Sequence, residues 1–579
     1  MKILKWLVIF ILFLFFLSFI SPLVAQPALM SQADISSSEK SKNGMIVTSD
    51  PIATKTGLEI LKQGGNAIDA AVTIGFVMAV TYPRAGNIGG GGFMLIYSAN
   101  NKKVVALDYR ETAPQKAYKS MFLDKNGRIN SNLKHFSHLS AGVPGTVAGL
   151  ALALEKYGTL SLAEVLAPAI KLAEEGFMVS PALSEMMEDN AIRLGSNSRS
   201  ISTQEIFFKS NGDTYKPGDI FIQKDLANTL KAMAEKGTEA FYKGEIADLI
   251  VKDMEMNDGL ITKTDLANYR PVIRQPVHGT YRGYDVYSMS PPSSGGVHII
   301  QILNMLEEYD ISSLGHNSIE SIHLMGEAMK RAFADRSKYL GDPDFVKIPI
   351  EGLLSKEYAA QLRTQIDHFK ATPSQDILPS PPPGYESNET THYSVIDKEG
   401  NAVSNTYTLN FSFGSGIVVS GAGFLLNNEM DDFSVKPGTP NAYGLISSRA
   451  NAIEPRKRML SSMSPTIVLK EGKPFLITGS PGGSQITTTI LQVIMNVIDH
   501  QMSIQEAVKA IRIHHQWLPD ELRYEEGLNP EVIKQLTEMG HKMVLKRTIG
   551  TAQSILVDQE KGFIYGAADP RRAGLALGY

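Results

Sequence analysis

Hydrophobic, β-branched and polar residues form the most regular pattern in two neighbouring stretches of the chain. Residues Thr391–Ile396 and Ala402–Leu409 are rich in strand-forming residues, and the polar, Gly-containing run Asp397–Asn401 lies between them. Two such stretches joined by a short turn predict a β-hairpin.

The turn determines which residues of the two predicted strands face each other. A turn centred on Glu399 places Thr390 opposite Thr408, and Asn410 follows two residues later on the same face. A slip of one residue would bring Leu409 to this position instead. The favoured register therefore predicts two threonine side chains next to each other.

The clearest helical pattern runs from Ser321 to Tyr339, with apolar residues at Ile322, Met325, Met329 and Phe333. This apolar stripe is far more typical of a core helix than of a ligand site.

Short strand-like stretches, such as Val104–Tyr109 and Thr466–Leu469, alternate with helical ones along the chain. Together with an antiparallel hairpin, they favour a layered fold of helices and sheets over a bundle or a barrel.

The start of the chain has the pattern of a secretory signal. Two lysines precede an apolar run from Trp6 to Ile20, and Ala25 offers a small residue for cleavage. The run is shorter than the roughly 20 residues that span a bilayer core, although an uncleaved anchor is an alternative. We expect removal of residues 1–25, a disordered linker over residues 26–43, and a secreted protein, periplasmic or extracellular, without a stable membrane span.

Composition limits the ligands and the catalytic groups that the protein can use. The 579 residues carry a formal charge of -4, which offers no electrostatic attraction for nucleic acid. The chain contains no cysteine, so disulfides, thiolate nucleophiles and thiolate-bound metals are excluded. A covalent nucleophile must therefore be Ser, Thr, Lys or a carboxylate.

A Pro-rich segment precedes the predicted hairpin. The five prolines between Ala371 and Glu389 exclude a helix or a central strand. From composition alone, an ordinary interdomain linker is favoured over an exposed loop with a role of its own.

Three further features fit either a functional role or a purely structural one. The Gly-rich run Gly86–Met94 lacks the Lys-Ser/Thr of a phosphate loop, so close backbone packing is favoured. Gly482 and Gly483 precede an apolar helical stretch, where backbone N–H groups form either an oxyanion hole or a plain turn. Arg110 follows a predicted strand and either binds a carboxylate or pairs with Glu111 on the surface.

Longer motifs occur together in one order: GGNAIDAAV from Gly64, GNIGGGGFM from Gly86, DYRETAP from Asp108, MKRAFADRSKYLGDP from Met329, TTHYSVID from Thr390, NNEMDDFS from Asn427, LSSMSP from Leu460, GSPGG from Gly479, HHQWLPDEL from His514 and ADP from Ala568. In this combination they resemble the γ-glutamyltransferase (γ-glutamyltranspeptidase) family. The resemblance extends from about Gly44 to Tyr579.

The resemblance implies an α+β fold of the N-terminal-nucleophile hydrolase type, a four-layer αββα sandwich, without cofactor or metal. It also implies a precursor that cuts itself between Glu389 and Thr390. The products are a large subunit, residues 44–389, and a small catalytic subunit, residues 390–579, which form a heterodimer. The Pro-rich segment then supplies accessible chain at the scissile bond. The freed α-amine of Thr390, with a reference pKa of about 8, can serve as the base for its own hydroxyl.

Family correspondence also implies a role for each site residue. Thr390 is the nucleophile, Thr408 hydrogen-bonds it, and Gly482 with Gly483 forms the oxyanion hole. The substrate-binding assignments are Arg110, Ser461 and Ser462 for the α-carboxylate, Asn410, Glu429 and Asp432 for the α-ammonium, and Tyr443 in a loop that covers the pocket.

The implied activity is transfer of a γ-glutamyl group from glutathione or a similar amide, through an acyl enzyme, to water or to an amino acid or peptide. A glutaryl or cephalosporin acylase and a poly-γ-glutamate hydrolase of the same fold are alternatives. Retention of Arg110 and Asp432 favours an α-amino acid end in the pocket. A secreted binding protein without catalysis is a rival from another class, opposed by Thr390, Thr408 and the glycine pair.

Overall fold

The structure is a computed structural model that describes residues 38–196, 200–377, 390–436, 438–442 and 444–579. The expected signal segment, residues 1–25, lies outside the described residues, as do Glu389 and Tyr443. Within those ranges, no helix combines the length and the apolar character needed to cross a membrane.

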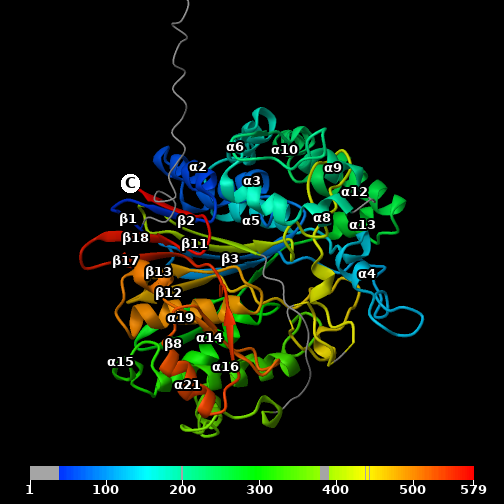
Figure 1. Ribbon diagram of the computed structural model, residues 1–579. Helices are drawn as coiled ribbons and strands as arrows, with labels where there is room; N and C mark the ends of the chain where they lie inside the picture. The colour runs from blue at the N-terminus through cyan, green and yellow to red at the C-terminus, as the bar shows by residue number, and fades with distance from the viewer. Residues whose placement is uncertain (1–37, 197–199, 378–389, 437, 443) are drawn as a thin grey trace, which may run out of the picture. The chain divides into compact units, whose positions relative to one another are not determined.

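Two seven-stranded antiparallel sheets form the centre of the molecule (Figure 1). The first, named the hairpin sheet because it contains the predicted hairpin, has the spatial order β19 (Leu575–Gly578), β2 (Met45–Thr48), β10 (Thr391–Ile396), β11 (Ala402–Thr408), β3 (Gly91–Ser98), β4 (Lys103–Asp108) and β7 (Val272–Arg274). The second, named the partner sheet, has the order β1 (Ser38–Ser41), β18 (Phe563–Ala568), β17 (Gln553–Asp558), β13 (Lys473–Thr478), β12 (Thr466–Lys470), β9 (Tyr284–Ser288) and β8 (Val277–Tyr281).

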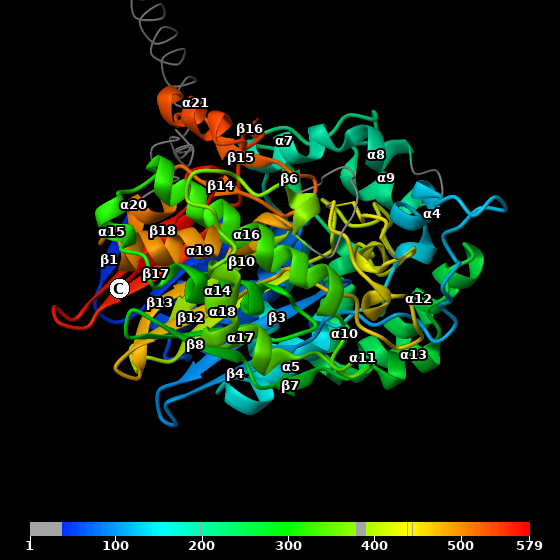
Figure 2. The same cartoon turned by 90° about the horizontal axis from the view of Figure 1, so that it is seen from below.

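Helices cover the outer face of each sheet (Figures 1 and 2). On the hairpin sheet they are α2 (Pro51–Lys62), α3 (Ala67–Thr81) and α5 (Thr146–Tyr157), with α6 (Leu162–Glu175) and α10 (Lys224–Lys236) outside them. On the partner sheet they are α14 (Gly295–Leu306), α19 (Gln485–Ile498) and α20 (Ile504–Lys509), with α16 (Ile319–Tyr339) against α14. The four layers confirm the expected αββα sandwich.

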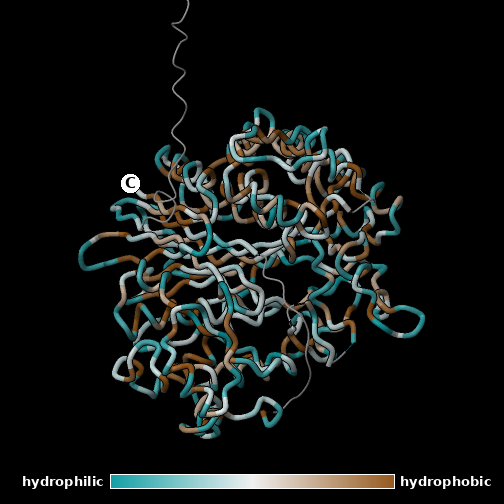
Figure 3. Tube along the Cα trace, viewed as in Figure 1, coloured by the Kyte–Doolittle hydropathy of each residue, from teal (hydrophilic) through white to brown (hydrophobic). Residues whose placement is uncertain are grey.

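Shorter elements lie around this sandwich, and the loops at its periphery are mostly hydrophilic (Figure 3). The helices are α4 (Ser131–His135), α7 (Pro181–Asp189), α8 (Ala191–Ser196), α9 (Ile201–Phe207), α11 (Glu239–Tyr242), α12 (Glu245–Met256), α13 (Lys263–Asn268), α15 (Ile311–Leu314), α17 (Ile350–Leu354), α18 (Lys356–Arg363) and α21 (Pro530–Glu538). The short strands are β5 (Phe177–Met178) with β6 (Ile220–Phe221), and β14 (Ile513–His514) with β15 (Leu522–Glu525) and β16 (Met543–Lys546).

Side chains alternate across the hairpin sheet. On β10, Tyr393 and Val395 lie in the core formed with the outer helices, whereas Ser394 faces the partner sheet and donates to Gln553 O at 3.0 Å. Even-numbered positions of β10 therefore point between the two sheets. Thr390, which directly precedes β10, shares this face.

The register of the hairpin is confirmed. Thr391 pairs with Tyr407 and Ile396 pairs with Ala402, as a turn centred on Glu399 requires. Continued by one residue, the same pairing sets Thr390 opposite Thr408.

The expected linker, residues 26–43, is wrong in its last part. Residues Ser38–Ser41 form β1, which pairs with β18 at the edge of the partner sheet. The sequence Ser-Glu-Lys-Ser has no hydrophobic alternation, so its pattern gives no strand signal. Main-chain hydrogen bonds to an open sheet edge form this strand.

Candidate active site

A cavity lies where the end of the central hairpin meets the loops that follow β4 and β11. About 310 Å³ of empty space lies within it, part of which is open to solvent. The predicted residues in its wall are Arg110, Thr390, Thr408, Asn410, Glu429, Asp432, Ser461, Ser462 and Gly483. Gly482 is adjacent to the wall in sequence but is not part of it.

Thr390, and not its neighbour Thr391, faces this cavity. Thr391 begins β10, and the strand pleat turns its side chain to the face that carries Tyr393. Thr390 lies on the opposite face, lines the cavity and is only 5% exposed. The sequence offers two adjacent threonines, and the pleat of the strand selects the first.

Thr408 and the Gly-rich run fix the geometry beside Thr390. The Thr408 hydroxyl accepts a hydrogen bond from the Asn410 N–H at 2.8 Å, which leaves its hydrogen for a different acceptor. A Cβ on Gly90 would lie 2.0 Å from the Thr408 carbonyl oxygen, and one on Gly89 would lie 2.1 Å from Leu425 O. The glycine run therefore serves close backbone packing, as the sequence favoured.

Asparagine side chains connect the hairpin to the acidic turn η4 (Glu429–Asp432). Asn410 has a φ of 77°, which Asn adopts more readily than most residues, and its amide donates to Asn428 O at 2.9 Å. The Asn427 side chain accepts from the Glu429 N–H at 3.0 Å. These bonds place the acidic side chains of η4 at the cavity.

Arg110 is surrounded by carboxylates inside the protein. Its Nη1 lies 2.7 Å from Glu429 and 3.6 Å from Glu111, and its Nη2 lies 2.5 Å from Asp432. Its Nε donates to Met459 O at 3.2 Å. Because Arg110 and Glu111 are both buried, the alternative of a surface pair between them is wrong.

This burial shifts the protonation of the acids. Desolvation raises the pKa of Glu111 to about 7 and the pKa of Glu429 well above its ordinary value, against the attraction of Arg110. Desolvation also raises the pKa of Asp432. Burial alone would lower the pKa of Arg110, but the carboxylates outweigh it and raise that pKa. One arginine among several acids is an environment that accepts a cationic group.

The loop before α14 holds Ser461 and Ser462 in the wall. The Ser461 N–H donates to Pro292 O at 2.8 Å, and the Ser294 N–H donates to Ser461 O at 2.8 Å. The Ser461 hydroxyl accepts from the Met463 N–H at 3.1 Å, so its hydrogen is left to be donated elsewhere.

Gly482 and Gly483 directly precede Ser484, the N-cap residue of α19. Their φ values of 134° and 54° lie in the region that favours glycine. The helix begins after Ser484 without a side-chain cap hydrogen bond. Its first two N–H groups donate to main-chain carbonyls, Gln485 N–H to Gly482 O at 2.9 Å and Ile486 N–H to Gly483 O at 3.3 Å. The positive end of the helix dipole favours negative charge nearby.

Sequence reasoning missed part of the wall: Arg336, Leu445, Leu460, Met463 and Ile486. Arg336 lies on α16, whose apolar stripe we interpreted as core alone. Because Arg336 follows Phe333 by three residues, the helical repeat places it on the same buried face. A charged residue in register with the apolar stripe was the signal that could have identified it.

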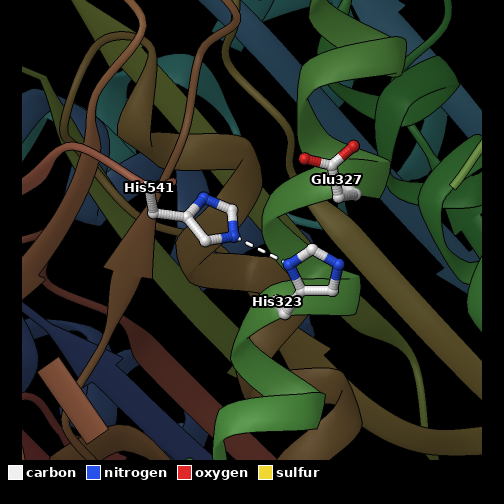
Figure 4. Close-up of side chains that lie close together, drawn as sticks. All are labelled: His323, Glu327 and His541. Atoms are coloured by element: carbon white, nitrogen blue, oxygen red, sulfur yellow. Dashed lines mark hydrogen bonds between the residues drawn. The ribbon is translucent and has the colours of Figure 1, made fainter. Parts of the chain in front are cut away.

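His323, Glu327 and His541 lie close enough to share a metal ion (Figure 4). His323 and His541 are, however, hydrogen-bonded to each other at 2.8 Å. Glu327 is paired with Lys330 at 2.9 Å and with Arg331 at 2.7 Å. A divalent cation would disrupt these pairs and add charge beside two cations, so the cluster does not fit a metal site.

The four layers, with a threonine at the end of a central strand facing a cavity, define the class of N-terminal-nucleophile hydrolases. The family model described as Gamma-glutamyltranspeptidase matches residues 53–579, and the chain belongs to this family. It is 53% identical to the glutathione hydrolase proenzyme of Escherichia coli (strain K12), over 95% of this chain and 94% of that protein. The resemblance found in the sequence motifs is confirmed.

Solved structures agree with this assignment. The crystal structure of cephalosporin acylase from Bacillus halodurans has a TM-score of 0.83 and 29% identity, over 97% of this chain and 99% of that chain. The crystal structure of Helicobacter pylori gamma-glutamyltranspeptidase is 50% identical, with a TM-score of 0.56, over 57% of this chain and 94% of that chain.

The raised pKa of Glu111 predicts a pH-dependent stability. Burial raises this pKa from 4.5 to about 7, so ionisation opposes folding, and stability present below pH 4.5 is lost as the pH rises through about 7. Glu111→Gln cannot ionise and should lose less stability over this interval. Urea unfolding across the interval measures the effect, with exposed Glu185→Gln as the control that should follow the parent. Parallel profiles for parent and Glu111→Gln would contradict the assignment.

Proposed function

We propose that this chain is a γ-glutamyltransferase and glutathione hydrolase that uses Thr390 as its nucleophile. The observation that carries this proposal is the position of Thr390 in a cavity that also contains Arg110, Glu429 and Asp432. These charges complement a group that carries both a carboxylate and an ammonium. The activity named for the Escherichia coli relative supports the proposal.

Maturation comes first. The Thr390 hydroxyl attacks the carbonyl carbon of Glu389, and the peptide C–N bond breaks as an ester forms on Thr390. Water hydrolyses this ester, which leaves a carboxylate on Glu389 and a free α-amine on Thr390. After removal of residues 1–25, the products are a large fragment, residues 26–389, which contains the expected large subunit 44–389 and strand β1, and the small subunit, residues 390–579. The name proenzyme of the relative supports such a cut.

Turnover uses the new α-amine. It takes the proton of the Thr390 hydroxyl, whose oxygen attacks the γ-carbonyl carbon of the substrate while Thr408 orients it. The N–H groups of Gly482 and Gly483 stabilise the oxyanion. The amine product leaves with the proton, and a γ-glutamyl ester remains on Thr390. Water or the amine of an amino acid or peptide acceptor then attacks the ester and restores the hydroxyl.

Recognition follows from the charges in the cavity. The α-carboxylate binds Arg110, Ser461 and Ser462, and the α-ammonium binds Asn410, Glu429 and Asp432. Because the bound group is a zwitterion, each of its charges gains an opposite partner and the net charge of the cavity stays the same.

The acylase alternative differs from this proposal by one group. A glutaryl chain keeps the distal carboxylate but has no ammonium. Its carboxylate would add a negative charge beside Arg110, which already pairs with Glu429 and Asp432, and would bring no cation for these two acids. An added buried charge without a new partner is costly, which favours the γ-glutamyl substrate. A poly-γ-glutamate hydrolase would recognise the same γ-glutamyl group but would act on a longer substrate.

The two subunits remain associated because both sheets contain strands from each. In the hairpin sheet, β10 and β11 of the small subunit lie between β2 and β3 of the large one. In the partner sheet, β12 pairs with β9 across the same boundary. Main-chain hydrogen bonds and the shared core therefore hold the heterodimer together after cleavage. The signal-like first 25 residues support export to the periplasm or the extracellular space.

Replacing each of the adjacent threonines tests the nucleophile. Thr390→Ala should remain a single inactive chain, since it has no hydroxyl to attack the preceding carbonyl. Thr391→Ala should mature, because that side chain faces away from the cavity. On a denaturing gel, a matured chain that has lost residues 1–25 should give fragments of about 21 kDa (residues 390–579) and about 40 kDa (residues 26–389), according to their shares of 63.2 kDa. Active enzyme that migrates as one uncut chain would contradict the mechanism.

Thr408→Val keeps the shape and removes the hydroxyl beside Thr390. We expect maturation and turnover to slow by an amount that corresponds to about 1 to 3 kcal/mol, the range for a lost buried polar partner. Thr406→Val is the matched control, because Thr406 lies on the same face of β11 but binds His392, at 2.8 Å. Equal rates of maturation and turnover for Thr408→Val and wild type would show that the Thr408 hydroxyl contributes to neither reaction.

Three anilide substrates separate the two halves of the recognition site. The γ-glutamyl anilide carries carboxylate and ammonium, the glutaryl anilide only the carboxylate, and the 4-aminobutyryl anilide only the ammonium. Arg110→Lys should lower kcat/KM by about 10-fold or more for the two carboxylate-bearing substrates, because lysine lacks the bidentate fork. Asp432→Asn should instead affect the two ammonium-bearing substrates. A wild-type preference for the glutaryl anilide would favour the acylase.

A further inference from the structure

Arg336 is a charged residue of the cavity wall that the proposed mechanism does not use. It extends from α16 and is only 3% exposed. Its Nε donates to Ser294 Oγ at 3.1 Å, and its Nη1 donates to Ser447 Oγ at 3.4 Å. No carboxylate oxygen of the described residues lies within 4.0 Å of its nitrogens.

Other buried arginines nearby are neutralised by carboxylates. Arg331, on the same helix, pairs with Glu327 at 2.7 Å, and Arg110 pairs with Glu429 at the same distance. The negative charge of Asp432 raises the pKa of Arg336, but the two residues form no ion pair. Its two oxygens already accept from Arg110 and, at 2.9 Å, from the Asn441 side chain. Arg336 is therefore the guanidinium of the wall that lacks an ion pair.

Arg336 is nevertheless charged. Burial lowers its pKa to about 10, which is still well above neutrality. A buried cation with two neutral hydroxyls as partners is costly unless an anion joins it. Such a charge is retained at a stability cost when a ligand supplies the missing partner.

The contacts of Arg336 place it between two parts of the wall. The Ser294 hydroxyl, which accepts its Nε hydrogen bond, itself donates to Ser461 O at 2.9 Å. Ser447, its other partner, lies two residues after Leu445 of the wall. The guanidinium therefore borders the side of the cavity that contains the serines assigned to a carboxylate.

We propose that Arg336 binds a carboxylate of the substrate. This inference rests on the proposed function, because a γ-glutamyl peptide supplies the anion. Two groups have this chemistry: the α-carboxylate of the glutamyl group and the C-terminal carboxylate of the leaving peptide. Either one completes the ion pair that the described residues leave open, and a guanidinium fork matches a carboxylate through two parallel hydrogen bonds.

The test measures kcat/KM of mature Arg336→Gln on four substrates: γ-glutamyl anilide, 4-aminobutyryl anilide, glutathione and the C-terminal amide of glutathione. Arg331→Gln is the matched control, since it removes a buried arginine of the same helix while Glu327 keeps Lys330. We expect a loss of about 10-fold to 100-fold on carboxylate-bearing substrates, typical of a buried charge pair that is truncated. The loss on 4-aminobutyryl anilide should be less than about 2-fold.

The substrates distinguish the two sources of the carboxylate. A loss on γ-glutamyl anilide identifies the α-carboxylate, whereas a loss on glutathione alone, absent for its amide, identifies the leaving peptide. Equal losses on all four substrates, or no loss on any, would overturn the proposal. If 4-aminobutyryl anilide is turned over too slowly, inhibition of γ-glutamyl anilide cleavage by L-glutamate and by 4-aminobutyrate gives the same comparison.

Thermal unfolding supplies an independent readout. Arg336→Gln removes an unpaired buried charge, so its Tm should equal or exceed that of wild type, and addition of L-glutamate should raise it less if the α-carboxylate is the ligand. A large fall in Tm together with uniform kinetic losses would assign Arg336 a structural role. If the wild-type enzyme does not cleave γ-glutamyl anilide, the proposed function itself is wrong, and this result is distinct from every outcome for Arg336→Gln.

Discussion

The main-chain pairing of β10 with β11 is the constraint on which the rest of this site depends. The register that pairs Thr391 with Tyr407 also sets Thr390 beside Thr408. Because side chains alternate along a strand, a slip of one residue would turn the first threonine toward the helices and remove it from the cavity. The other parts of the site are arranged around this pair: Gly90 lies against Thr408, and the Asn410 N–H binds its hydroxyl.

The cavity combines functional charges with a cost in stability. Arg110 is held among acids that burial makes harder to ionise. Among the described residues, Arg336 contacts two serine hydroxyls and forms no ion pair. A hydrophobic replacement of such groups often stabilises a protein, so the charges are better explained by what they bind than by what they stabilise. A zwitterionic α-amino acid group, with a carboxylate and an ammonium only one carbon apart, matches this distribution of charge.

Much of the site could be predicted from the sequence, and what could not has physical reasons. The hairpin and its register follow from a turn between two strand-rich stretches, and the family motifs identified most residues of the wall. The pairing of Arg110 with Asp432 joins residues 322 positions apart, and no local pattern encodes such a contact. Arg336 was missed because an apolar stripe indicates which face is buried but not that a charge can share it. Strand β1 was missed because an edge strand is held by its backbone.

The central claim is that Thr390 carries the acyl group during turnover. The most direct test is to quench mature enzyme with acid during turnover of a γ-glutamyl substrate and to examine the two fragments by mass spectrometry. The account predicts that the small fragment begins at Thr390 and gains the mass of one glutamyl group, which peptide mapping places on that threonine. An adduct on Thr391 or on any other side chain, or a small fragment that begins at a different residue, would contradict it.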